Sequence, residues 1–275
     1  MSALPATDPD RLVATKAPDG VQAMFHTIAP TYDLLNHVFS GGIDTWWRAL
    51  TARTLLRAGD PDYPRRVLDL CAGTGDLALA IHRRARRLAP GQAPPVIMTS
   101  DFTPRMVALA APKYRAAAQS GKSSGPGPAP SVGDALRLPF ADSAFDLATV
   151  AFGIRNTSDH RACLAEMVRV TRPGGIIAVL EFSRMKAPLL QRGFDFYFSR
   201  VLPSVGAFLT RTPAYRYLAK SVKGFPDTPE FSAHMAEAAG APVTARRLTF
   251  GIATLYTAKV GKQLTAGARR REGPE

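Results

Sequence analysis

One short segment constrains the fold more than any other part of the chain. Residues 66–77 read Arg-Val-Leu-Asp-Leu-Cys-Ala-Gly-Thr-Gly-Asp-Leu, which is an apolar strand, a turn with Gly73 and Gly75, and the start of a helix. Glycines let the backbone approach a ligand closely, and the free N–H groups of the first helical turn face that ligand. The segment therefore predicts an α/β fold with a nucleotide-cofactor pocket at a strand end. A structural turn without a ligand is the alternative, because a lone G-x-G is a weak motif.

The residues around the glycines bear on which cofactor the turn holds. A dinucleotide loop reads G-x-G-x-x-G, and Ala78 in the third position is compatible with it, so the glycines leave two cofactor classes open. Asp69 at the strand end and Asp76 after Gly75 are more informative. Two carboxylates repel a pyrophosphate, whereas they attract the ammonium and sulfonium cations of S-adenosylmethionine. We therefore expect S-adenosylmethionine as the cofactor.

Two further acidic residues follow later strands. Asp101 ends the second apolar run, where an acidic residue can accept hydrogen bonds from both hydroxyls of a ribose. Its alternative role is to cap the helix that opens at Thr103. Asp134 is placed to accept a hydrogen bond from an adenine amino group, with Ala135 and Leu136 against the ring. The alternative for Asp134 is an ordinary turn residue.

The composition is that of a globular protein. The chain has 275 residues, of which 46% are hydrophobic, enough for one α/β domain with an insertion. No apolar run is long enough to span a bilayer, and residues 1–10 carry no signal-peptide pattern. The two cysteines, Cys71 and Cys163, have neither disulfide-framework nor metal-ligand spacing. We therefore expect a cytoplasmic protein without a metal site, in which Cys71 is a small buried side chain rather than a nucleophile.

The net charge of +13, from 35 Lys and Arg against 22 Asp and Glu, is the main competing signal. It is compatible with nucleic acid, with an anionic membrane surface, or with no specific partner. The basic residues are dispersed along the chain, and the first cluster, at residues 83–87, is typical of a solvated helix face.

Composition also divides the chain into segments. We expect a flexible leader over residues 1–18, one domain over residues 19–262 and a basic flexible tail over residues 263–275. Within the domain, residues 19–57 have the pattern of a helical, aromatic-rich cap, and residues 184–238 that of a mostly helical insertion.

Strands and helices alternate between the cap and the insertion. A Gly/Pro/Ser loop at residues 121–131 occupies the place of the third strand, which we expect to be short and to lie near residues 131–134. The remaining predicted elements are a helix at 106–111, a fourth strand at 145–151, a helix at 161–170, a fifth strand at 176–180, and a closing strand pair at 244–250 and 254–260.

Four longer motifs carry a family resemblance. They are Tyr32-Asp33-Leu34-Leu35-Asn36-His37-Val38-Phe39-Ser40 continuing to Trp47, Cys71-Ala72-Gly73-Thr74-Gly75-Asp76, Phe152-Gly153-Ile154-Arg155-Asn156, and residues 169–183 around Pro173-Gly174-Gly175. Over roughly residues 22–261 the chain resembles the class I S-adenosylmethionine-dependent C-methyltransferases of ubiquinone and menaquinone biosynthesis. These motifs are much more specific than a glycine turn.

The resemblance implies a Rossmann-like α/β fold. Its mostly parallel seven-stranded sheet would have helices on both faces, a closing antiparallel strand pair, a helical N-terminal cap and a helical insertion. It also implies cofactor contacts at Thr74, Asp101, Asp134 and Ala135, and at Ala151, the last residue of the fourth strand.

The implied reaction transfers a methyl group to a ring carbon of a polyprenylated quinol. The substrate would be a naphthoquinol, for menaquinone, or a benzoquinol precursor of ubiquinone, and we favour menaquinone because no ubiquinone-specific feature is visible. A lipid-tailed substrate implies peripheral contact with the inner face of the cell membrane, through the aromatic insertion. The oligomeric state stays open, a homodimer included.

Arg155 and Asn156 are our candidates for activating the quinol. They follow the fourth strand at its carboxyl end, where open α/β sheets place reacting groups. A guanidinium is a poor base, so we expect Arg155 to stabilise the developing quinolate or to orient a water. Asn156 could hold that water or the second quinol oxygen. The alternative for Arg155 is a surface ion pair with Asp159.

The N-terminal motif supplies the remaining candidates. We expect Tyr32, Asp33 and Asn36 to close over the methyl group and the substrate. A packing turn in which Asp33 is a helix N-cap is the alternative. The chain departs from the family pattern at Leu35, where the family often has Met, at Asp44, where it has His, and at Ala151, where it often has Ser.

Three competing functions are compatible with parts of this sequence. A nucleic-acid methyltransferase is favoured by the charge, but the chain lacks an Asn/Asp-Pro-Pro-aromatic motif, a catalytic cysteine motif and an added RNA-binding domain. We therefore expect no nucleic-acid partner. A binding module without activity, and a methyltransferase for another aromatic or natural product, are the other two alternatives.

Overall fold

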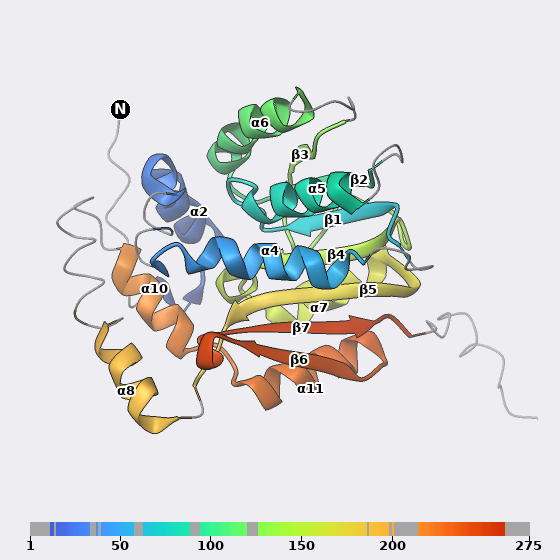
Figure 1. Ribbon diagram of the computed structural model, residues 1–275. Helices are drawn as coiled ribbons and strands as arrows, with labels where there is room; N and C mark the ends of the chain where they lie inside the picture. Colours follow the sequence, from blue (N-terminus) through green and yellow to red (C-terminus); the bar gives the residue numbers. More distant parts are fainter. Residues whose placement is uncertain are drawn as a thin grey trace, which may run out of the picture.

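A single sheet organises the described part of the chain. The computed structural model describes residues 12–13, 15–33, 37, 40–57, 63–88, 94–119, 126–185, 187–197, 200 and 214–261. Within these residues, seven strands form one sheet in the order β3-β2-β1-β4-β5-β7-β6 (Figure 1). The strands are β1 (Arg66–Leu70), β2 (Val96–Asp101), β3 (Ala129–Val132), β4 (Phe145–Ala151), β5 (Thr171–Phe182), β6 (Val243–Leu248) and β7 (Ala253–Lys259).

Strand direction brings the loops that carry the predicted site to one edge of the sheet. The pairs among β1 to β5 are parallel, whereas β7 is antiparallel to both β5 and β6. Parallel strands have their carboxyl ends at the same edge, so the loops after β1, β2, β3 and β4 meet there. The predicted fold class, a mostly parallel sheet with a closing antiparallel pair, is confirmed.

Helices cover both faces of the sheet (Figure 1). α4, α5 and α6 pack on one face, and α7 and α11 pack on the other. The helical elements are α2 (Pro18–Ile28), η1 (Ala29–Thr31), α4 (Ile43–Leu55), α5 (Asp76–Leu88), α6 (Pro104–Gln119), η2 (Ile154–Asn156), α7 (His160–Val170), α8 (Pro188–Phe196), α10 (Ala214–Lys223), α11 (Thr228–Ala239) and η4 (Thr249–Gly251).

Alternation along the central strands explains the two layers. Val67 and Ile97 are buried with α4, α5 and α6, whereas Leu68 and Leu70 are buried with α7 and α11. Successive side chains of a strand point to opposite faces, so one apolar run supplies both cores. Each of these side chains contributes roughly 1.5–3 kcal/mol on burial. The glycine turn is therefore attached to the best-buried strand of the sheet.

Several predicted boundaries differ from the structure; β6, for example, was expected to reach residue 250 but ends at Leu248. β3 begins at Ala129, inside the expected loop, because an edge strand tolerates Pro130. β5 begins at Thr171 rather than at residue 176, and Pro173-Gly174-Gly175 lies in an irregularity of its register with β4. α6 does not end before Pro112 but continues to Gln119.

The N-terminal region packs more closely than its sequence suggested. Leu12 is buried with Val21 of α2 and Tyr217 of α10, and Lys16 reaches the cavity described below. This part of the expected flexible leader therefore lies against the fold. Residues 1–11 and the expected basic tail at 263–275 lie outside the described residues.

The expected insertion contains helices with different surroundings. α11 packs on the sheet beside α7, with Phe231 and Met235 in the same core as Leu164 and Met167. α8 and α10 lie instead at the end of the sheet where α2 is found (Figure 1). Among the helices described, none is both long enough and apolar enough to cross a membrane.

Candidate active site

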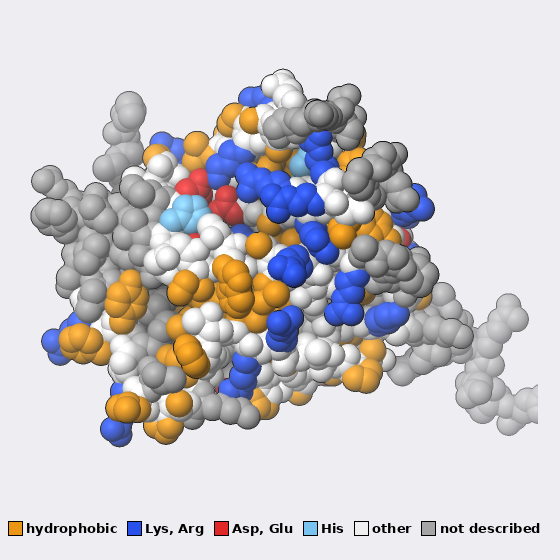
Figure 2. Space-filling view, viewed as in Figure 1, with side chains coloured by type: hydrophobic (Ala, Val, Ile, Leu, Met, Phe, Trp, Pro, Cys, Tyr) orange, Lys and Arg blue, Asp and Glu red, His pale blue; other side chains and the backbone are white. Residues whose placement is uncertain are grey.

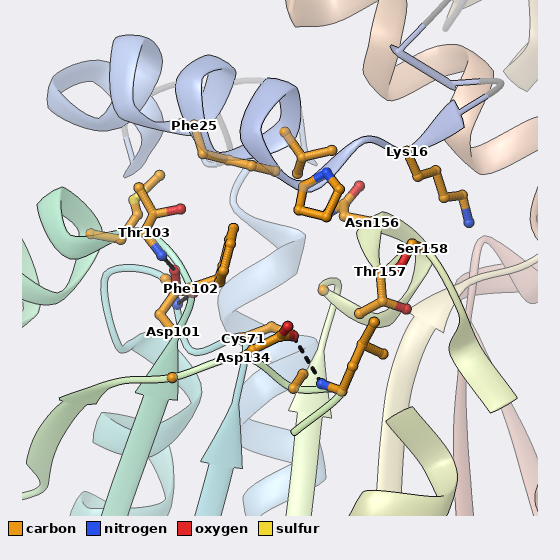
Figure 3. A pocket seen from close by; sticks show the side chains of 18 of the residues that line it. Lys16, Phe25, Cys71, Asp101, Phe102, Thr103, Asp134, Asn156, Thr157 and Ser158 are labelled. Carbon is orange, nitrogen blue, oxygen red and sulfur yellow. Dashed lines mark hydrogen bonds between the residues drawn. The ribbon is translucent and has the colours of Figure 1, made fainter. Parts of the chain in front are cut away.

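A cavity lies at the carboxyl ends of the central strands, beneath α2 (Figure 3). The empty space in it, part of which is open to solvent, is about 800 Å³. Val21 and Phe25 of α2 line one side, and Cys71 and Gly73 of the glycine turn line the other. The cavity is therefore at the place that the glycine turn predicts.

The glycine turn depends on backbone conformations that favour glycine. Gly73 has a φ of 56° and Gly75 a φ of 89°, both in the left-handed region. The nearest atom to a Cβ added at Gly73 would belong to the Tyr32 ring, at 3.7 Å, and a Cβ at Gly75 would overlap the Tyr114 hydroxyl. Cys71 has a φ of 47°, and burial raises the pKa of its thiol, so this side chain is neutral.

Asp101 joins the second strand to the glycine turn. Its carboxylate accepts hydrogen bonds from the backbone N–H of Gly73 at 2.8 Å and from that of Thr103 at 2.8 Å. Burial raises the pKa of this carboxyl group. Asp101 also lines the cavity. The capping role at the start of α6 is therefore present, and the carboxylate is placed for a ligand as well.

The loop after β3 contributes Asp134 and Ala135 to the cavity lining. The Asp134 carboxylate accepts a hydrogen bond from the backbone N–H of Leu136 at 2.9 Å (Figure 3). This is the turn role that was the alternative for Asp134, and it fixes the exposed carboxylate at the cavity. Gly133 lies so close to the Ser100 hydroxyl that an added Cβ would be 2.6 Å from it. A glycine is therefore needed where this loop crosses β2.

Asp69 does not line the cavity with the other carboxylates. It is fully buried at the end of β1, and neither carboxylate oxygen has a hydrogen-bond partner among the described residues. Burial raises its pKa to about 8, so at neutral pH the group is mostly protonated. In this arrangement Asp69 is a mostly neutral acid that lies below the turn and outside the cavity lining, and its contact with the cofactor stays a prediction.

Thr74 and Asp33 meet, although 41 positions separate them. The Thr74 hydroxyl donates to the Asp33 carboxylate, and Lys113 of α6 lies 2.5 Å from Asp33 and 3.3 Å from Asp76. Thr74 is buried and does not line the cavity. Tyr32, the neighbour of Asp33, does line it. These contacts attach the N-terminal motif to the cofactor turn, while Asn36 lies outside the described residues.

Arg155 is buried and is not among the residues that line the cavity, although Phe152 and Asn156 on either side of it are. Its partner is not Asp159. Its Nη1 donates to the Glu181 carboxylate at 2.8 Å and to the Phe152 carbonyl, and its guanidinium lies 5.3 Å from the centre of the Phe182 ring. Asp159 instead caps α7 by accepting from two backbone N–H groups. Burial raises the pKa of Glu181. The alternative of a surface ion pair is therefore wrong.

Asn156 follows Arg155 and lines the cavity (Figure 3). Its Oδ1 is buried and has no hydrogen-bond partner among the described residues, so it can accept a hydrogen bond from a ligand or a water. Ala151 is half-buried at the end of β4 and does not line the cavity. Gly153 lets this segment approach the glycine turn, because an added Cβ would overlap the Cβ of Cys71.

The departure from the family pattern at Asp44 is a buried structural feature. Asp44 accepts hydrogen bonds from Ser40 at 2.7 Å and from Arg48, and it lies 3.0 Å from the His37 ring. Burial alone would raise its pKa, but the hydrogen bonds from Ser40 and His37 and the charge of Arg48 leave it lowered. The residue is not among those that line the cavity.

Three residues near the site had no assigned role in the sequence analysis. Lys16 lines the cavity, and burial lowers its pKa. Glu181 lies within a family motif, but nothing in that motif indicates its pairing with Arg155. Lys113 sits on α6, 80 positions from Asp33. A search for basic residues on the helix after β2 could have suggested it, whereas Lys16 has no local signal.

The lining fits an adenosyl cation better than a phosphate-bearing cofactor. Two carboxylates, Asp101 and Asp134, face the cavity, and Lys16 is the single Lys or Arg among its described lining residues. The unpartnered Oδ1 of Asn156 provides a further hydrogen-bond acceptor in the lining. This sheet order, glycine turn and acidic lining define a class I methyltransferase.

The family follows from direct comparison. The model of the ubiE/COQ5 methyltransferase family matches residues 13–259, and the chain belongs to that family. Its cofactor is S-adenosylmethionine. The Deinococcus radiodurans protein named demethylmenaquinone methyltransferase is 44% identical over 86% of this chain and 90% of its own. The Geobacter sulfurreducens protein named ubiquinone/menaquinone biosynthesis C-methyltransferase UbiE is 40% identical, over 90% of this chain and 91% of its own.

Solved structures agree with the fold. A Thermotoga maritima S-adenosylmethionine-dependent methyltransferase, described as a possible histamine N-methyltransferase, has a TM-score of 0.56 at 17% identity, and the match covers 87% of this chain and 99% of that one. The cyclase SpnF has a TM-score of 0.55 at 22% identity, covering 89% and 96%. Proteins with such different activities share the architecture, so the fold alone does not identify the substrate.

Proposed function

We propose that this enzyme methylates a ring carbon of a polyprenylated quinol, and that it converts demethylmenaquinol to menaquinol. A benzoquinol precursor of ubiquinone is the second candidate for the same site. The names of the relatives from Deinococcus radiodurans and Geobacter sulfurreducens support the quinone class. The observation that carries the proposal is the cavity lined by two carboxylates and by the unpartnered Oδ1 of Asn156, whose chain neighbour Arg155 forms a buried pair with Glu181.

The cofactor side of the cavity is assigned to four residues. Asp101 would accept hydrogen bonds from the ribose, and Asp134 would accept one from the adenine amino group, with Ala135 against the ring. Gly73 would bring the backbone of the turn close to the methionine part. When bound, S-adenosylmethionine supplies an already activated methyl group. The shape of the glycine turn would be maintained, from the side away from the cavity, by Thr74, Gly75 and Asp69. Ala151 would contribute by packing at the end of β4.

The quinol side is assigned to the segment after β4. Glu181 fixes the guanidinium of Arg155 from β5, and the Phe182 ring covers it, so its charge is held in a low-dielectric surrounding. A fixed guanidinium can stabilise the quinolate oxygen whose charge activates the adjacent ring carbon. The free Oδ1 of Asn156 can accept a hydrogen bond from the second quinol hydroxyl, or from a water that takes the proton of the first.

The N-terminal motif is assigned to closure. Tyr32 lines the cavity, and Asp33 is bonded to both Thr74 and Lys113, so the motif is held over the cofactor turn. This closure would align the quinol carbon, the methyl group and the sulfur. Alignment of that kind can lower a barrier by up to roughly 7–11 kcal/mol.

A methylation assay with two acceptors tests the proposal. The purified chain is incubated with S-adenosylmethionine and either a short-tailed demethylmenaquinol or a short-tailed benzoquinol precursor, and the products are analysed by mass spectrometry. We expect the naphthoquinol to gain one methyl group and to be the better substrate. Faster turnover of the benzoquinol would assign the enzyme to ubiquinone. If neither quinol is methylated while another aromatic is, the quinol proposal is wrong.

Quinones extracted from a deletion strain provide an independent readout. We expect the demethylated naphthoquinone to accumulate and to disappear when the intact chain is returned. A nucleic-acid methyltransferase would leave the quinones unchanged. Because the natural acceptor carries a polyprenyl tail, we also propose that the enzyme works at the inner face of the cell membrane as a peripheral protein.

A further inference from the structure

One face of the molecule presents large apolar side chains to solvent. Trp46 of α4 is 53% exposed, Phe250 of η4 is 82% exposed, and Leu189 and Phe196 of α8 are 80% and 63% exposed. Figure 2 shows hydrophobic side chains gathered over the left half of α4, the turn between β6 and β7, and α8. Single exposed apolar residues are common on proteins, whereas a gathered group marks an interaction surface.

Contacts between the elements place these side chains on one surface. The Trp47 ring N–H donates to the Thr249 hydroxyl at 2.8 Å, so α4 and η4 are neighbours. The segment that leads into α8 also contacts η4, since the Ser183 hydroxyl donates to the Gly251 carbonyl at 2.8 Å. Trp46 and Phe250 are each next in the chain to a residue of the first hydrogen bond, so their backbones lie on neighbouring elements, with α8 beyond η4 (Figure 1).

The turn that presents Phe250 has an uncommon backbone. Thr249 and Phe250 have φ values of 45° and 56°, and Gly251 follows with 95°. β-branched and bulky residues rarely occupy the left-handed region, and such strain persists where the surrounding structure maintains it, often at functional positions. Here the result is a phenylalanine that is held outward at the corner of the sheet.

Arginines border this apolar group. α5 carries Arg83 and Arg87, α4 carries Arg53 and β6 carries Arg246, all of them exposed. Figure 2 shows Lys and Arg side chains running over α5 and over the right half of α4. Asp76, the one carboxylate among the described residues that line the groove between α4, α5 and α6, is already paired with Lys113. The border is therefore cationic.

We propose that the docking face, defined as Trp46, Phe250, Leu189 and Phe196 with Arg53, Arg83, Arg87 and Arg246, binds the surface of an anionic lipid bilayer. The apolar side chains would enter the headgroup region, and the arginines would contact lipid phosphates. This inference rests on the proposed lipid-tailed substrate. Nucleic acid fits the arginines equally well, but it leaves exposed Leu189 and Phe196 without a role.

The position of the face relative to the cavity agrees with this arrangement. α8 and α10 lie at the end of the sheet where α2 covers the cavity (Figure 1). A bilayer on the docking face would thus adjoin that end, and a quinol could enter without its tail crossing water.

Vesicle sedimentation tests the docking face. The full-length chain is mixed with vesicles of phosphatidylcholine alone or of phosphatidylcholine with phosphatidylglycerol, at low and high salt. We expect binding to the anionic vesicles that weakens with salt. Arg83→Gln/Arg87→Gln should weaken it about fivefold for each charge removed. Trp46→Ser/Phe250→Ser should weaken it about tenfold. Arg137→Gln/Arg161→Gln, at exposed positions on the side of α7, and Val132→Ser are the matched controls and should bind as the unaltered chain does.

The outcomes separate the docking face from the proposed function. Methylation of a short-tailed, water-soluble quinol should be unchanged in the docking variants, while methylation of a long-tailed quinol in vesicles should fall with binding. Unaltered vesicle binding by both docking variants would overturn the inference. The inference would also be overturned if the arginine variant lost oligonucleotide binding but still bound vesicles as the unaltered chain does. If no quinol is methylated but the vesicle results hold, the docking face stands and the substrate proposal fails.

Discussion

Arg155 and Glu181 come from neighbouring strand ends and form a buried ion pair with an N–O distance of 2.8 Å. Arg155 lies in η2 directly after β4, and Glu181 lies near the end of β5, which is paired with β4 in parallel. Both side chains are nearly inaccessible to solvent. A buried pair of this kind adds little to stability compared with apolar residues, but it holds a charge in one place.

Removal of the guanidinium should affect turnover more than cofactor binding. We expect Arg155→Ala to bind S-adenosylmethionine within about twofold of the unaltered affinity but to lose about 10²–10³ in kcat, the usual effect of losing one stabiliser of a developing oxyanion. Single-turnover kinetics and a binding titration measure the two quantities. Glu181→Gln keeps the size of the partner and should give an intermediate kcat. Near-normal turnover in Arg155→Ala would remove the assigned role.

Lys113 should act together with Asp33 in holding the N-terminal motif. Lys113→Met leaves Asp33 and Asp76 without their shared cation, so we expect the apparent affinity for S-adenosylmethionine to fall by about tenfold. Asp33→Asn should have a similar effect, and the double variant should be little worse than either single one. Lys113→Arg, which keeps the charge, is the control. Fully additive effects would show that the two residues act separately.

The buried acid Asp69 should make stability depend on pH. Its pKa in the folded state is about 8, above its ordinary value of 3.8, so between these values the folded chain holds a proton that the unfolded chain has lost. The free energy of unfolding therefore falls as pH rises from about 4 to about 8. The free energy of unfolding of Asp69→Asn should therefore rise relative to that of the unaltered chain, by on the order of a few kcal/mol across this pH range. Urea unfolding at several pH values measures this difference, with the exposed Asp19→Asn as the control. If the free energies of unfolding of Asp69→Asn and of the unaltered chain change with pH in parallel, the prediction is wrong.

Gly153 and Cys71 should show a mutual steric dependence. A Cβ added at Gly153 overlaps the Cβ of Cys71, so Gly153→Ala should lower stability by about 1–3 kcal/mol and weaken cofactor binding. Cys71→Gly removes the obstructing atom, and glycine tolerates the φ of 47° at that position. The double variant should therefore recover most of the loss in a thermal unfolding assay. Cys71→Ala keeps the Cβ and should not rescue.

Local patterns predicted the elements that have strong local signals. The apolar run of β4 has the predicted bounds, and α7 begins one residue before its predicted start because Asp159 caps it. β3 was displaced by two residues because Pro130 argues against a strand unless the strand lies at an edge, and edge position is a property of the whole sheet.

For the candidate site, the sequence predicted which loops take part but not how their side chains are paired. Asp101, Asp134 and Asn156 do line one cavity. The motif that contains Arg155 predicted that this segment takes part in the reaction. The partner of Arg155, Glu181, is 26 positions away, and no local sequence pattern connects the two residues. The same holds for Lys113, which joins two motifs only after α6 has packed beside the turn.

Local sequence patterns are enough to predict a strand, a glycine turn and a helix start at residues 66–77, and the chain carries the motifs of the ubiE/COQ5 methyltransferase family. Backbone conformation and hydrophobic alternation act over a few residues, so they can be read along the chain. Only the folded chain shows which carboxylates face the cavity, that Asp69 is buried with a raised pKa, and which cations pair with Asp33 and Glu181. Burial and charge pairing depend on residues brought together from distant segments, and therefore exist only in the folded molecule.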